Sequence, residues 1–190
     1  MMRLNHTATF ARIVLIVLLG SSCGSEKQYF KKALTRSDKD FLSKNDSLIK
    51  DFNGRTNWYK QYWNGPLLVH RTHGRYDFKQ VGKWKQTSKD GTELYATTNF
   101  DEYGFLKDEK IFAYDGGIDV ETTCKKDTIN KNVVLECQTI WNYTGTNIIR
   151  RKSRSIIKGG KSYKHGRWEY FSQEGKLMKI EEYVMNKRID

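Results

Sequence analysis

The residues of this chain whose types and spacing could do chemistry are two nearby histidines, three cysteines and a run of lysines and arginines. His70 and His73 lie three residues apart, but no cysteine lies near them in the sequence to complete a metal site. A turn beside Gly74 explains the segment better. No Ser, Cys or carboxylate pair has the spacing of a nucleophile and its base, and no phosphate-binding glycine loop is present. We therefore expect no enzyme, no metal and no cofactor. A hydrolase assembled from distant turns is the remote alternative.

Cys23 follows a segment that is typical of an export signal. Arg3 and Arg12 give a positive start without an acidic residue, residues 13–19 are apolar, and small residues precede the cysteine. The alternative is a transmembrane anchor, which needs about 20 apolar residues. Because the apolar run is far shorter, we predict a cleaved signal peptide over residues 1–22.

The same segment resembles the lipobox of bacterial lipoproteins, in which the cysteine after the small residues is acylated and becomes the new N-terminus. The usual pattern has Leu three residues before the cysteine, where this chain has Gly20, and Leu19 lies one place further back. Looser boxes of this kind are familiar from Bacteroidota-type lipoproteins. The resemblance implies a lipid on Cys23, and two or three acyl chains at about 0.8 kcal/mol per methylene would hold the protein at a membrane. We expect the cell envelope, at the outer membrane of a Gram-negative bacterium.

The other two cysteines, Cys124 and Cys137, form an even pair in an oxidising compartment, which favours a disulfide over a metal site. Residues 125–132 between them are polar and turn-prone, and β-forming runs lie on either side. We therefore predict that the two cysteines face each other on adjacent strands.

Between Glu136 and Glu169 the chain has no acidic residue but many cations. This basic segment consists of Arg150, Arg151, Lys152, Arg154, Lys158, Lys161, Lys164 and Arg167. On a strand over residues 148–157, Arg150, Lys152 and Arg154 would share one face, with Arg151 opposite. Two interpretations stay open: a solvated strand protected against edge pairing, or a contact surface for phosphates and anionic headgroups.

The formal charge of +12 falls by two when Arg3 and Arg12 leave with the signal, and the remaining surplus favours anionic partners. Export removes nucleic acid from the expected partners. Anionic headgroups, lipopolysaccharide and acidic proteins remain, together with the membrane that the lipid enters. The oligomeric state stays open.

The mature chain divides into a tether with one or two short helices over residues 23–52 and a β-rich domain over residues 53–190. In the second part, large aromatic residues recur at nearly even intervals, and glycines follow them. This aromatic ladder is Trp58, Trp84, Phe112, Trp141 and Trp168. Each unit has the length of two strands and two turns, so we predict a mainly β fold, an antiparallel meander of about five hairpins. The ladder is either the packed face of the sheet or an aromatic platform for a ligand.

The last unit, over residues 165–187, resembles the bacterial MORN-type repeat. It has Gly166 and Trp168, an acidic residue before Gly175, then Leu177 and Tyr183 in the expected places. Residues 82–94 and 62–67 match in part. The resemblance implies a single-layer repeat sheet without an active site. Similar proteins are often labelled antitoxin components, a label that fits poorly with an exported, basic chain.

We therefore expect a non-enzymatic envelope lipoprotein that acts as a binding or scaffold module for a protein or an anionic surface partner. The alternative from another class is an immunity or antitoxin-like protein that neutralises a partner toxin. Neither the ligand nor the leaflet follows from the sequence.

Overall fold

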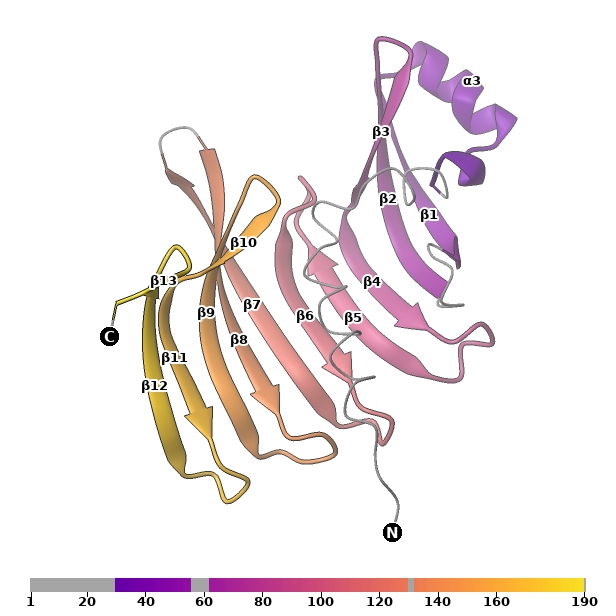
Figure 1. Ribbon diagram of the computed structural model, residues 1–190. Helices are drawn as coiled ribbons and strands as arrows, with labels where there is room; N and C mark the ends of the chain where they lie inside the picture. Colours follow the sequence, from indigo (N-terminus) through magenta and orange to yellow (C-terminus); the bar gives the residue numbers. More distant parts are fainter. Residues whose placement is uncertain (1–29, 56–61, 130–131, 190) are drawn as a thin grey trace.

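The computed structural model describes residues 30–55, 62–129 and 132–189 of the chain. In these residues the protein is one open antiparallel sheet, preceded by two short helical segments (Figure 1). The mainly β meander predicted from the sequence is therefore confirmed. Residues 30–33 form the end of the first helical segment, and α3 spans Arg36–Lys44.

Thirteen strands form the sheet, and most of them pair with their neighbours in the sequence. Along the main path the order is β1-β2-β4-β5-β6-β7-β8-β9-β11-β12-β13, while β3 pairs with β2 and β10 pairs with β9. The strands are β1 (Ser47–Arg55), β2 (Tyr62–Thr72), β3 (Arg75–Gln80), β4 (Gly82–Thr87), β5 (Leu94–Phe100), β6 (Leu106–Phe112), β7 (Ile118–Ile129), β8 (Asn132–Asn142), β9 (Ile149–Lys158), β10 (Lys161–Lys164), β11 (Gly166–Phe171), β12 (Leu177–Val184) and β13 (Lys187–Arg188).

The sheet begins earlier than the boundary at residue 53 that the sequence predicted, because β1 starts at Ser47. This strand lies at the edge and buries only part of one face. Phe52 is buried, Leu48 packs against the same core, and Ile49 between them is largely exposed. Two apolar residues on the packed face are too few to distinguish a strand from a polar tether in the sequence.

The repeat is carried by the hairpin turns. Four turns share one pattern, in which the N–H of a glycine donates to the carbonyl of the residue three places before it. These glycines are Gly91, Gly104, Gly116 and Gly175, and all have φ between 75 and 84°. Because residues that carry a side chain rarely adopt this left-handed backbone conformation, the turn requires glycine at a fixed distance from the preceding strand. The recurring spacing from Trp84 to Gly91 and from Trp168 to Gly175 follows from this geometry.

One face of the sheet, here called the groove face, carries a row of residues that stand directly opposite one another on successive strands. The row runs across six strands through Trp84, Thr98, Glu109, Thr122, Thr139 and Ser153. Since paired residues in a β-ladder point to the same side, these side chains share one surface.

The groove face has two separate apolar clusters. The first closes the N-terminal end, where the helical segments and the link between them contribute Phe30, Leu34 and Leu42 to a cluster with Phe52 and Trp84. The second lies in the middle of the sheet, around the disulfide between Cys124 and Cys137. These cysteines are paired residues on β7 and β8, so both the predicted disulfide and its placement on adjacent strands are confirmed.

Candidate functional site

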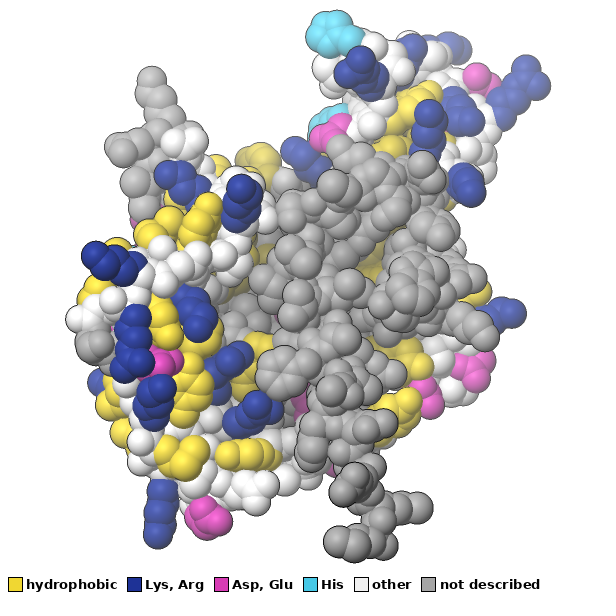
Figure 2. Space-filling model, in the orientation of Figure 1, with side chains coloured by type: hydrophobic (Ala, Val, Ile, Leu, Met, Phe, Trp, Pro, Cys, Tyr) yellow, Lys and Arg dark blue, Asp and Glu magenta, His cyan; other side chains and the backbone are white. Residues whose placement is uncertain are grey.

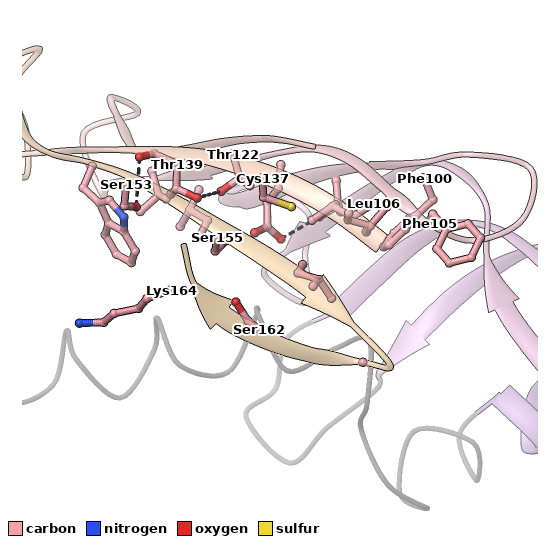
Figure 3. A pocket seen from close by; sticks show the side chains of 18 of the residues that line it. Phe100, Phe105, Leu106, Thr122, Cys137, Thr139, Ser153, Ser155, Ser162 and Lys164 are labelled. Carbon is pink, nitrogen blue, oxygen red and sulfur yellow. Dashed lines mark hydrogen bonds between the residues drawn. The ribbon is translucent and has the colours of Figure 1, made fainter. Parts of the chain in front are cut away.

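A groove of about 380 Å³ lies between the groove face of β5–β9 and the short strand β10 (Figure 3). Its apolar floor, as we name it, consists of Phe100, Phe105, Leu106, Ile111, Leu135 and Ile157. Ser162 and Lys164 of β10 stand across the groove from the sheet and bound it on that side. The β9–β10 hairpin therefore turns part of an open sheet into a three-sided channel.

The middle of the groove is crossed by a row of hydroxyl groups that bond mainly to one another or to the backbone. The Thr122 and Thr139 hydroxyls lie 3.2 Å apart, and the Ser153 hydroxyl donates to the Thr139 carbonyl at 3.4 Å. Threonine is favoured here because its branched side chain packs well on a pleated sheet. These three hydroxyls already have partners within the protein, so they are less available to a polar ligand.

Glu109 lies in the same row and is the buried carboxyl group of the groove. Its side chain is 5% exposed, and it accepts a hydrogen bond from the Thr98 hydroxyl at 3.3 Å. Burial raises the pKa of Glu109 to about 7, because removing a carboxylate from water disfavours its charged form. Below that pH the groove holds a neutral acid at this position.

One end of the groove, formed by Trp141, Arg151, Lys164 and Trp168, is cationic and aromatic. The Arg151 guanidinium lies 4.3 Å from the Trp141 ring centroid and 5.0 Å from that of Trp168. The register explains the first contact, since Arg151 stands directly opposite Trp141 on β8. Burial lowers the pKa of Arg151, the effect expected of a desolvated cation. In the described part of the chain, Arg151 has no salt bridge, and its Nε is buried without a hydrogen-bond partner.

Lys164 reaches the same indole from β10. Its ammonium group lies 4.5 Å from the Trp168 centroid and 4.6 Å from that of Tyr183. The backbone of Lys164 is fixed by Asn186, whose side-chain oxygen accepts the Lys164 N–H at 2.7 Å and whose own N–H donates to the Lys164 carbonyl at 2.9 Å. The turn after β12 therefore holds β10, and with it Lys164, over the groove.

The predicted basic segment does not form one surface. Arg150, Lys152 and Arg154 lie exposed on the face opposite the groove, while Arg151 alone points from β9 into it, as the alternation of a strand requires. Lys158 and Lys161 are exposed at the β9–β10 turn. Of the whole segment, only Arg151 and Lys164 line the groove. Figure 2 shows lysine and arginine side chains interspersed with hydrophobic ones over the C-terminal strands.

The aromatic ladder is correct at its described ends and wrong in its middle. Trp84 lies in the row on the groove face, and Trp168 continues that row, since the next residue, Glu169, pairs with Lys152. The middle positions of the row are instead Glu109 and Thr139.

The two misplaced aromatics lie elsewhere. Trp141 lies nearer the turn, opposite Val120, and Phe112 lies at a register shift opposite Ile118. Bulges and unequal strand lengths shift the aromatic residues relative to the turns, so even spacing in the sequence does not give even spacing in the sheet.

The two interpretations of the ladder apply to different members. Trp84 is fully buried among Phe30, Phe52 and Trp63, with its indole N–H donating to the carbonyls of Pro66 and Val81, so it is core. Trp141 and Trp168 line the groove.

The other predictions concern the turn at Gly74, the export signal with Cys23, and Trp58. His73 and Gly74 form the turn between β2 and β3, both with positive φ, which confirms the turn predicted beside Gly74. The signal peptide over residues 1–22, the acylated Cys23 and Trp58 lie outside the described residues. Sequence reasoning missed Glu109, because the charged run around it gives no sign that one member is buried.

Comparisons with known proteins find no family model, no curated protein and no solved structure that matches this chain. The resemblance to MORN-type repeats therefore stays a prediction. Among the described residues, none of the helices is both long and apolar enough to cross a bilayer.

Proposed function

We propose that this protein is a non-enzymatic, lipid-anchored binding protein of the bacterial cell envelope, and that its groove receives an anionic partner. The signal segment and Cys23 support the anchor, and the MORN-like repeats support a scaffold without catalytic groups. The observation that carries the proposal is Arg151, a cation in the groove wall that contacts two indoles and forms no ion pair among the described residues.

Arg151 is partly buried, and removing a charge from water is costly unless the charge is paired; ring contacts compensate only in part. Nε is buried, so an anion beside Arg151 would accept from the guanidinium N–H groups at the end of the side chain. Carboxylates and phosphates fit best because a guanidinium presents a planar pair of donors. Lys164, on the same indole, adds a second positive charge.

Below its pKa of about 7, the Glu109 carboxyl is neutral and does not repel an anionic ligand. Because burial raises the pKa of Glu109 to about 7, the carboxyl is largely neutral in mildly acidic solution. We therefore expect an anion that does not itself titrate in this range, such as benzenesulfonate, to bind more tightly at pH 6 than at pH 8.

The test uses the full mature chain with Cys23→Ser, which removes the acylated residue, and phenyl phosphate as the probe. Titration is followed by tryptophan fluorescence, because two indoles flank the site. The groove variant is Arg151→Gln with Lys164→Gln. Its matched control is Arg150→Gln with Lys152→Gln, which removes the same charge from the opposite face of β9.

We expect the control to bind like the parent and the groove variant to bind at least about tenfold more weakly, as loss of one or two charged contacts implies. Equal weakening of both variants would mean that only the overall charge attracts the probe, and the proposal would fail. It would also fail if the parent showed no saturable binding at low salt.

A further inference from the structure

We infer that the ligand of the groove is a single-chain anionic amphiphile, with its headgroup at Arg151 and Lys164 and its alkyl chain along the apolar row of Trp141, Val120 and Ile111. This inference rests on the proposed function and names the chemical class of the ligand.

One row of the groove face supplies a continuous apolar path away from the cations. Arg151 on β9 stands opposite Trp141 on β8, Trp141 opposite Val120 on β7, and Val120 opposite Ile111 on β6, and all four residues line the groove. Four strands at a spacing of about 4.8 Å give a path of about 14 Å across the sheet. A path of this length suits an extended alkyl chain.

The hydroxyls of the neighbouring row are already bonded within the protein. Thr98 donates to Glu109, and the Thr122 and Thr139 hydroxyls bond to each other. A peptide strand in the groove would need partners for its own N–H and carbonyl groups, and leaving them unpaired would cost free energy. An alkyl chain makes no such demand, so the groove favours a hydrocarbon over a polypeptide.

The charge of the headgroup follows from the groups that face it. Arg151 and Lys164 are both cations on the Trp168 ring. Glu181, the acid that stands opposite Trp168 on β12, is already engaged by the hydroxyls of Tyr170 and Tyr183 and by Lys179 and Arg188. The headgroup therefore meets two cations whose nearby acid is occupied elsewhere, which favours an anion over a zwitterion or a cation.

The position of β10 favours a single chain over a membrane surface. Lys164 and Ser162 stand across the groove from the sheet, so Arg151 lies inside a channel and not on a protruding face. A flat bilayer could contact the exposed Arg150, Lys152 and Arg154, but these lie on the other side of the sheet. The ligand therefore enters as a monomer.

The experiment measures the affinity of unlipidated mature protein (Cys23→Ser) for alkyl phosphates of increasing chain length, from butyl to dodecyl, below their micelle concentrations. Calorimetry gives the dissociation constants. Each methylene transferred from water to the apolar row contributes about 0.8 kcal/mol, so the dissociation constant should fall about fourfold per carbon until the row is covered, and then level off. Alkyl trimethylammonium ions of equal length should bind at least about a hundredfold more weakly.

Two variants separate the chain from the headgroup. Arg151→Gln should weaken all alkyl phosphates by a similar factor and keep the chain-length slope. Ile111→Ser, at the far end of the apolar row on β6, should flatten the slope for long chains and leave butyl phosphate unchanged, with circular dichroism showing that the sheet is intact.

An affinity that does not depend on chain length, with phenyl phosphate still bound at Arg151, would overturn the amphiphile and leave the proposed function standing. Equal binding of the trimethylammonium series would also overturn it. If neither phenyl phosphate nor any alkyl phosphate binds, the proposed function itself fails.

Discussion

The Trp84 indole lies directly against the backbone of Gly65, so closely that a Cβ on residue 65 would approach three ring atoms to 2.5–2.7 Å. The indole is fully buried, and Phe52 stacks on it with ring centroids 5.9 Å apart. Its N–H donates to the carbonyls of Pro66 and Val81 at 3.0 Å. The glycine is therefore required by the packing of the N-terminal core, although its own backbone has no positive φ.

Gly65→Ala should destabilise the protein by about 1–3 kcal/mol, because the indole cannot move away without losing its hydrogen bonds and its stacking on Phe52. Urea unfolding followed by circular dichroism measures the change. Gly117→Ala is the matched control, since the nearest atom to its added Cβ is the movable Asp115 carboxylate oxygen at 3.2 Å. Similar midpoints for the two variants would contradict this account of Trp84.

The disulfide should contribute to stability through the unfolded chain that it constrains. The cysteines are 13 residues apart in the sequence, and closing a loop of this length is worth about 3 kcal/mol in the chain-entropy model. Dithiothreitol should therefore lower the urea midpoint of the parent. The Cys124→Ser, Cys137→Ser double variant should show the lower midpoint already and should not respond to the reductant. A response of the double variant, or none in the parent, would contradict the prediction.

Asn186 lines the groove beside Lys164 and offers a way to loosen β10 without changing a charged or aromatic residue. Its φ of 72° is tolerated by glycine, so Asn186→Gly removes mainly the side-chain oxygen that accepts the Lys164 N–H. We expect a loss of about 0.5–1.5 kcal/mol in unfolding free energy. Binding of phenyl phosphate should also weaken, because Lys164 is no longer held above Trp168.

Asn186→Asp keeps an acceptor oxygen at this position and is the control. It should retain the stability of the parent more closely than Asn186→Gly does. If Asn186→Gly left probe binding unchanged, Lys164 would not depend on this turn for its position.

The sequence predicted the fold because its signals were local. The turn glycines need positive φ, and the cysteines lie on either side of a polar turn, so both can be recognised from neighbours in the chain. The prediction of an export signal also rests on residues that are neighbours in the chain. The alternation along β9, which places Arg151 on one face of the sheet and Arg150 and Lys152 on the other, was predicted correctly for the same reason.

The groove could not be predicted because it depends on register. Only the pairing of β8 with β9 places Arg151 on Trp141, and only the return of β10 places Lys164 on Trp168. The burial of Glu109 likewise depends on Thr98 and Thr122 on the strands to either side. A register shift changes the partners of all these residues while leaving the sequence pattern of each strand intact, so the pattern predicts the strand and not its partners.

Glu109 should make the stability of the protein depend on pH in an unusual direction. Its pKa is about 7 in the folded protein and 4.5 in a model peptide, so the folded state binds the proton more tightly than the unfolded state does. The contribution of this group is therefore most favourable below about pH 4.5 and is lost as the pH rises through about 7. The loss amounts to about 3 kcal/mol over that interval, to within a factor of two.

Glu109→Gln removes the titrating proton and keeps a side chain of the same shape that can bond to Thr98. The parent should lose stability in urea between pH 5 and pH 8 relative to this variant, and the difference between the two should stay constant above pH 8. Many other groups titrate in the chain, but they contribute equally to both proteins and cancel in the comparison. Parallel stability curves for the parent and Glu109→Gln between pH 5 and pH 8 would show that the carboxyl reaches water and is ionised throughout, and the groove would then present a negative charge to any anion that enters it.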